Sequence, residues 1–142
     1  MATFTRPDIL SENIANKVFD FDTDSFRWAL SNTAPVLGST FLLSNVTQIA
    51  SGGGYTQVTD GAGGLVPVLS FAPTGQVTTV SGSQVVLTAS GPVASFRYLY
   101  LIDDTPTSPL NPVIGWIDHG SVVTMAVDDT YTVPSAGYFT IG

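Results

Sequence analysis

A strand with apolar residues on both of its faces constrains the fold of this chain more than any other feature. Along residues 96–102, alternate side chains point to opposite sides of an extended backbone, and both sets are mainly apolar. The strand therefore has to be covered on both faces. The sequence Asp-Asp-Thr-Pro at residues 103–106 ends it, because proline cannot donate to a β-ladder and aspartate favours turns. A second extended run at residues 113–117 predicts a long-looped hairpin at the centre of the domain.

Short extended runs separated by turn residues fill the chain from residue 65 onward. This spacing, with little helix, is typical of an all-β domain, and we predict an antiparallel β-sandwich. Both a jelly-roll-like and an immunoglobulin-like topology fit the pattern. Besides the central pair, the strands are expected at residues 65–71, 77–80, 85–89, 122–127, 130–133 and 138–141. Ser-Gly-Ser at residues 81–83 indicates a tight hairpin between the second and third of these.

Two further strands and one helical turn are predicted nearer the start. Residues 18–22 and 26–30 alternate between apolar and other side chains, and Thr-Asp-Ser at residues 23–25 is a turn signal. We therefore expect a hairpin there. Within residues 41–50, apolar side chains are spaced as on a helix, which favours a single helical turn.

The first 17 residues are predicted to form an N-terminal arm, and residues 18–142 a single sandwich domain. Pro7 suits the first turn of a helix, but a short helix is marginal unless it docks against something. The arm is then a short helix or an extended segment ordered by whatever it lies against. A helix packed on its own domain is the alternative. The helical face of this segment consists of Ile9, Leu10, Ile14 and Val18.

Charge and composition exclude several classes of partner. The formal net charge is −7, with only four Lys and Arg side chains, so the chain lacks the basic surface that nucleic acids and anionic membranes require. No apolar stretch is long enough for a transmembrane helix, the start lacks the order of a signal peptide, and there is no cysteine. Only 11% of residues are charged, against roughly 25% in an average domain. Either other chains cover part of the surface, or uncharged polar side chains form it.

Nothing in the sequence indicates catalysis or a cofactor. His119 is the single histidine, and Asp118 and Ser121 lie close to it in sequence. Neighbouring strand residues face opposite sides, so this proximity does not make a catalytic triad. The glycine-rich segments at residues 51–55 and 60–64 are loops rather than phosphate-binding loops, because no lysine follows them. We expect no enzyme activity, no cofactor and no catalytic residue.

Two features of the sequence suggest ligand binding, and each has a simpler explanation. The Asp-x-Asp-x-Asp run at residues 20–24 is similar to a calcium loop, but Ser25 and Ser31 occupy the positions where an EF-hand needs glycine and glutamate. Solvated turn carboxylates explain the run better, and no metal is expected. A sugar-stacking platform is the second chemistry, although alternating strand positions make core packing the default. Its aromatic candidates are Trp28, Trp116, Tyr55, Tyr98 and Tyr100.

Several segments together resemble a family of small virion proteins of tailed bacteriophages. The residues that carry the resemblance are the run at 17–30 (KVFDFDTDSFRWAL), Gly-Tyr-Thr at 54–56, Gly-Gly at 63–64, Phe-Arg-Tyr at 96–98, Asp-Thr at 104–105, Ser-Pro-Leu at 108–110, Ile-Gly-Trp-Ile-Asp at 114–118, Gly-Ser at 120–121 and Gly-Tyr-Phe-Thr-Ile at 137–141. The likeness covers most of the chain after residue 16, in the same order. The chain departs from the family between residues 55 and 64, where the Gly-Thr-rich stretch is reduced relative to that of the family.

The resemblance implies a structural protein of the particle, placed here as a head decoration (cement) protein. It would be made in the host cytoplasm and bind the exterior of the phage head, with the major capsid protein and copies of itself as partners. Deleting residues 1–17 should weaken this binding and leave the β-fold intact. A receptor- or carbohydrate-binding module of a tail or head fibre is the alternative function. The contacts are expected at the arm and at the outward-facing residues of the central strand, namely Ile9, Leu10, Ile14, Arg97, Leu99 and Leu101.

Overall fold

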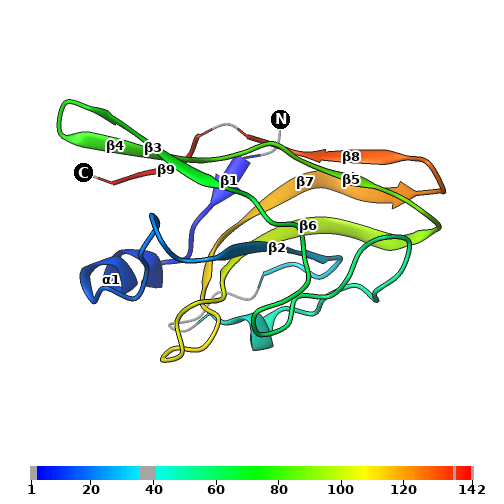
Figure 1. Cartoon of the computed structure of the whole chain (residues 1–142), viewed down its shortest axis with the longest axis horizontal. Coiled ribbons are helices and arrows are strands. Elements are labelled where there is room, and N and C mark those ends of the chain that lie inside the picture. The colour runs from blue at the N-terminus through cyan, green and yellow to red at the C-terminus, as the bar shows by residue number, and fades with distance from the viewer. Residues whose placement is uncertain (1–2, 36–40, 136, 142) are drawn as a thin grey trace.

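The protein is an antiparallel, sandwich-like all-β fold. The computed structural model describes residues 3–35, 41–135 and 137–141. One layer is a four-stranded sheet in the order β1-β7-β6-β2, and the other contains a three-stranded sheet β3-β4-β9 and a two-stranded ladder β5-β8 (Figure 1). The all-β prediction is confirmed. The elements are β1 (Thr3–Thr5), α1 (Ile9–Ala15), β2 (Phe26–Ser31), η1 (Leu43–Asn45), β3 (Leu69–Thr74), β4 (Val77–Gly82), β5 (Val85–Thr88), β6 (Val93–Asp103), β7 (Val113–Met125), β8 (Thr130–Val133) and β9 (Gly137–Ile141).

The predicted central hairpin is the pair β6–β7, and both faces of β6 are covered. Tyr100 pairs with Trp116 and Leu99 with Ile117 across the ladder. One face packs in the large core between the two layers, where Leu99 and Leu101 have no exposed surface. The other face, with Tyr100 and Ile102, belongs to a second and smaller core.

The second core is closed by the loop segments that follow β2 rather than by another sheet. Phe41 stacks on Tyr100 and Trp116, at ring-centroid distances of 5.8 and 5.9 Å. The backbone N–H of Val113 donates to the carbonyl of Phe41 at 2.9 Å, which fixes the loop against the edge of the sheet. The predicted single helical turn lies in this region as η1.

Residues 18–22 do not form the predicted strand, so no hairpin joins them to β2. Backbone N–H groups of Asp22 and Thr23 donate to the Asp20 carboxylate, at 3.1 and 3.3 Å. The Asp24 carboxylate in turn accepts from the backbone N–H of Asp20 at 2.9 Å. Local side-chain acceptors thus satisfy the backbone in a turn and replace a strand ladder. We call residues 20–24 the aspartate turn.

The predicted tight hairpin at residues 81–83 is also wrong. β4 pairs with β3 and β9, whereas β5 pairs with β8, so residues 83–84 carry the chain from one sheet to another. The hairpin of this region is instead β3–β4, which turns at Gly75 with a φ of +65°. Sequence alternation located β4 and β5 but not their partners. The strand predicted at residues 65–71 is β3, which begins only at Leu69 and continues to Thr74.

The strand predicted at residues 122–127 is the far end of β7. Phe96 pairs with Val123 and Tyr98 with Asp118, so two steps along β6 correspond to five along β7. The extra residues bulge out around Gly120, whose φ of +93° suits glycine. This register shift also breaks the alternation along β6, because Phe96 lies in the same core as Leu99 and Leu101.

The N-terminal segment is built into the domain, which favours the second of the two sequence alternatives. β1 pairs with β7 at one edge of the four-stranded sheet, with Phe4 opposite Ile117. Leu10 of α1 has no exposed surface and lies in the large core. An intact fold after deletion of residues 1–17 is therefore no longer expected, because the deletion removes an edge strand and a core side chain.

Replacing Leu10 with Ala should destabilise the isolated protein by about 2–5 kcal/mol, because it removes a fully buried side chain and leaves a cavity. The matched control is Ile9→Ala on the same helix, where a half-buried side chain should give a clearly smaller loss. Urea unfolding measures both free energies. Equal, near-zero effects would show that α1 does not dock.

Candidate functional site

The structure separates the six residues predicted to make partner contacts. Leu10, Leu99 and Leu101 are fully buried within the chain, so their side chains are not available to a partner, and the predicted outward face of the central strand is wrong for Leu99 and Leu101. The physical reason is that the second layer covers this face of β6, so both faces of the strand are buried. Ile9 and Ile14 are half-buried on α1. Ile14 borders a small cavity of about 290 Å³ beside β9, next to Arg6 and Thr140.

Arg97 is also partly exposed, and it is engaged within the chain. Its guanidinium donates to both carboxylate oxygens of Asp118, at 2.7 and 3.0 Å, and lies 5.3 Å from the ring centroid of Tyr98. The Arg97 guanidinium holds the pKa of the Asp118 carboxyl below its usual range. Because both side chains are more than a third exposed, solvent screening leaves the pair little net contribution to stability.

The side chains around His119 have other partners. Its Nδ1 lies 3.2 Å from the hydroxyl oxygen of Tyr131. The Asp118 carboxylate is taken up by Arg97 and by the backbone N–H of Gly120 at 2.8 Å. Within the described residues, no hydrogen bond joins His119 to Asp118 or Ser121.

The aromatic residues considered for sugar stacking belong to the interior. Trp28, Trp116, Tyr55 and Tyr100 are buried, and Tyr98 is half-buried. Two of their hydroxyls serve the fold: Tyr55 accepts from the backbone N–H of Leu30 at 3.0 Å, and Tyr100 donates to the carbonyl of Thr33 at 2.9 Å. These rings do not form an exposed platform.

A buried acidic cluster, which the sequence interpretation had assigned to a turn, lies where β6 ends beside the start of β2. Asp103 is fully buried and Asp104 nearly so. Arg27 forms an ion pair with Asp104 and also donates to the carbonyls of Gly63 and Gly61, at 2.8 and 3.0 Å. The cluster holds the glycine-rich loop against the sheet.

The Asp103 carboxyl is kept in its uncharged form within this cluster. Among the described residues, no hydrogen bond reaches its Oδ2, and the side chain of Asp24 lies nearby. A neighbouring acidic group disfavours the ionisation of a buried carboxyl. Burial, reinforced by Asp24, raises the pKa of Asp103 to about 9. The pair is a structural junction, and no group of three or more metal-ligating side chains occurs among the described residues.

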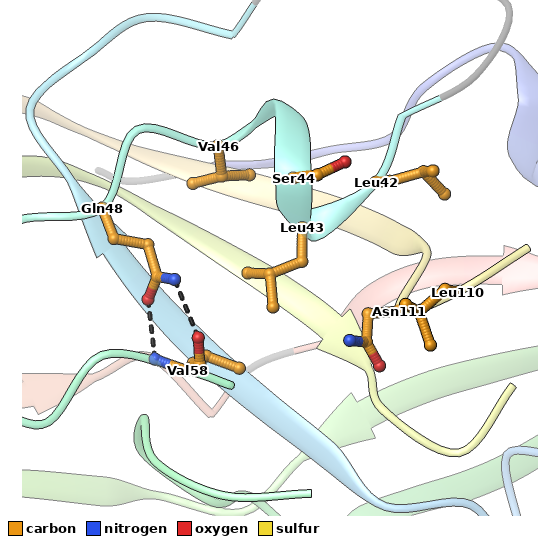
Figure 2. A pocket seen from close by; sticks show the side chains of 8 residues that line it. All are labelled: Leu42, Leu43, Ser44, Val46, Gln48, Val58, Leu110 and Asn111. Carbon is orange, nitrogen blue, oxygen red and sulfur yellow. Dashed lines mark hydrogen bonds between the residues drawn. The ribbon is translucent and has the colours of Figure 1, made fainter. Parts of the chain in front are cut away.

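A groove with mainly apolar walls lies between η1 and the β6–β7 loop (Figure 2). It has a volume of about 440 Å³, and none of its lining side chains is ionisable. Figure 2 shows Gln48 held by two hydrogen bonds to the Val58 backbone, at 2.7 and 2.9 Å. This groove can make contacts but cannot do acid–base chemistry. Its lining residues are Leu42, Leu43, Ser44, Val46, Gln48, Val58, Leu110 and Asn111.

The most exposed apolar surface of the described residues lies along β3 and the segment before it. Val68 is 71% exposed and Val66 55% exposed, while Phe71 and Val77 are also exposed. Two grooves, of about 230 and 570 Å³, separate this strand from the aspartate turn. No Asp, Glu, Lys, Arg or His occurs between Asp60 and Arg97, so the whole β3–β4 hairpin is uncharged. This gap in the charge pattern is the sequence signal that could have located the surface.

Comparisons of the chain with protein-family models, with curated proteins and with solved structures found no match. None of the described helices is both long enough and apolar enough to cross a membrane. The function is therefore inferred from the geometry of the chain itself, which has two surfaces suited to contacts: the groove beside η1 and the exposed apolar surface at β3.

Asp103→Asn should raise the free energy of unfolding at pH 8 by on the order of 2 kcal/mol, because it removes a carboxyl that the fold must keep protonated. The folded-state pKa of Asp103 lies above the usual 3.8. Its contribution to stability is thus fully present below pH 4 and is lost as the pH rises toward 9. Measured by urea unfolding between pH 5 and 9, the free energy of unfolding of the variant should depend less steeply on pH than that of the wild type.

The matched control is Asp104→Asn, which removes the ion-pair partner of the neighbouring Arg27. We expect this variant to lose about 3–5 kcal/mol. It should keep most of the pH slope of the wild type, because the Asp104 charge is the smallest of the causes that raise the pKa of Asp103. An Asp103→Asn protein that is destabilised at pH 8, with an unchanged slope, would contradict an uncharged Asp103 in the folded protein.

Proposed function

We propose that this protein is a non-enzymatic structural protein of a tailed-bacteriophage virion, a decoration (cement) protein that binds the outside of the head and stabilises it. Its partners are the major capsid protein and other copies of itself. The placement within a phage particle comes from the sequence resemblance. The structure supports a role in assembly through one observation, the uncharged and exposed apolar edge at β3.

An exposed edge strand with apolar side chains is a liability for a protein that works alone. Edge strands of monomeric proteins are usually protected by charged side chains, by proline, by strong bulges or by a covering segment. In β3, Pro73 protects only the last part of the strand. β3 is exposed from Ser70 to Thr74 and has no charge nearby in its hairpin. In a shell, neighbouring chains would cover this strand. The apolar surface buried there would contribute roughly 25 cal/mol per Å² to the free energy of association, before the entropic cost of ordering the partners.

The charge of the protein supports a position on the exterior of the head. The net charge of −7 disfavours contact with packaged DNA, whose phosphates would repel an acidic protein. The burial of the aromatic residues removes the feature that favoured a carbohydrate-binding module.

Val68→Lys should reduce the amount of protein that rebinds to heads from which it has been removed. The substitution places a charge in the apolar surface, where it loses hydration on binding. Because Val68 is mostly exposed in the single chain, the fold should be unaffected. Quantitative gel densitometry of heads purified after mixing measures the bound protein, and we expect at least a tenfold loss of affinity, equivalent to about 1.4 kcal/mol.

The matched control is Val127→Lys, which adds the same charge at a 56% exposed valine beside the Asp128-Asp129 turn, away from β3. This variant should rebind like the wild type. Equal rebinding of both variants would remove β3 from the binding surface, and failure of the wild-type protein to bind heads at all would refute the decoration role.

A further inference from the structure

The free edge of β3 exposes a short and well-defined set of backbone groups. Ser83 N–H donates to the carbonyl of Val68 at 2.8 Å, and Val68 N–H donates to Ser83 Oγ at 2.9 Å, so the backbone of Val68 faces β4. Backbone groups in an antiparallel ladder alternate between the two sides of a strand. Leu69 and Phe71 therefore direct both N–H and C=O away from β4, toward the free edge.

Two prolines bound this edge symmetrically. Pro67 lies two residues before Leu69, and Pro73 lies two residues after Phe71. Pro73 is in phase with Leu69 and Phe71, and neither proline has an N–H to donate. The donors on the outward side are thus those of Leu69 and Phe71, centred on Ser70.

This pattern is complementary to itself. If a second copy of β3 is laid antiparallel with a two-fold axis at Ser70, Leu69 of each copy lies opposite Phe71 of the other. Each of these two pairs can exchange both N–H···O bonds, while the prolines fall at the ends where no donor is needed. A second copy carries its own prolines at the same two ends, so neither chain has a donor left without an acceptor beyond these two pairs.

The net charge of −7 on each chain opposes pairing, and this repulsion is weakest where two copies meet through residues that carry no charge. The β3–β4 hairpin carries no charge of its own, while the aspartate turn lines the grooves beside it. In the pairing, Val68 of one copy would lie opposite Ala72 of the other. Apolar contacts then flank the short ladder.

We propose that two copies of the protein pair antiparallel through the free edges of β3, with a two-fold axis at Ser70. This pairing deepens the proposed function, since it identifies the contact between neighbouring decoration proteins. It requires no capsid, so it is tested in solution separately from head binding.

Ser70→Cys should form a disulfide-linked dimer under mild oxidation. Residues that face each other as a non-hydrogen-bonded pair have Cα atoms about 4.5 Å apart, within the range that a disulfide needs. The chain has no cysteine of its own, so every cross-link reports the introduced position. The readout is the dimer fraction of the full-length protein on a non-reducing gel.

Ala72→Cys is the matched control, at an equally exposed site two residues along the same strand. In the proposed register its two copies lie roughly 13 Å apart along the strands, too far for a disulfide. Dimer from Ser70→Cys but not from Ala72→Cys supports the pairing. Equal cross-linking, preferential cross-linking of Ala72→Cys, or no cross-linking overturns it.

A charge variant gives an independent measurement. Ser70→Lys places two lysines directly opposite each other at the axis, so we expect a loss of dimer in sedimentation velocity at a concentration where the wild type associates. Circular dichroism checks that the fold is unchanged. A monomeric wild type, or a dimer that survives Ser70→Lys, would overturn the proposal, whereas a dimer that fails to bind heads would refute only the decoration role.

Discussion

The β6–β7 ladder is the interaction on which the rest of the structure depends. Its strands are apolar on both faces, so each face has to be covered, and the two coverings differ. The layer containing β3, β4, β9, β5 and β8 covers one face (Figure 1), and the loop segments around Phe41 and Val58 cover the other. Polar junctions fix these coverings in place: Gln48 binds the backbone of Val58, and Arg27 binds the glycine-rich loop. The described part of the segment between β2 and β3, residues 32–35 and 41–68, thus contributes side chains to the core.

Much of the fold could be predicted from the sequence because strand alternation and turn residues are local signals. They located the central hairpin, η1 and the β8 and β9 strands. They failed where the outcome depended on contacts between distant residues. The aspartate turn replaced a strand because carboxylates satisfied the local backbone. β4 and β5 joined different sheets, a choice that alternation does not encode. The phase of β6 changed because of a bulge in its partner.

The candidate surface was mislocated for the same reason. Periodicity shows which side chains share a face but not which face is outward, so Leu99 and Leu101 were assigned to contacts although they are buried. The exposed surface lies instead on a hairpin whose most informative property is the lack of ionisable residues between Asp60 and Arg97. The approach of Asp24 to Asp103 had no sequence signal, because the two carboxyls come from distant segments.

The account rests on the claim that this β-rich, sparsely charged protein works while covered by neighbours in a shell. The most direct measurement is its copy number in purified virions of the phage that the proposal implies, obtained by quantitative mass spectrometry against the major capsid protein. A decoration protein should be present at a number of copies comparable with that of the major capsid protein. A copy number as low as that of a fibre protein, or absence from the particle, would contradict the account.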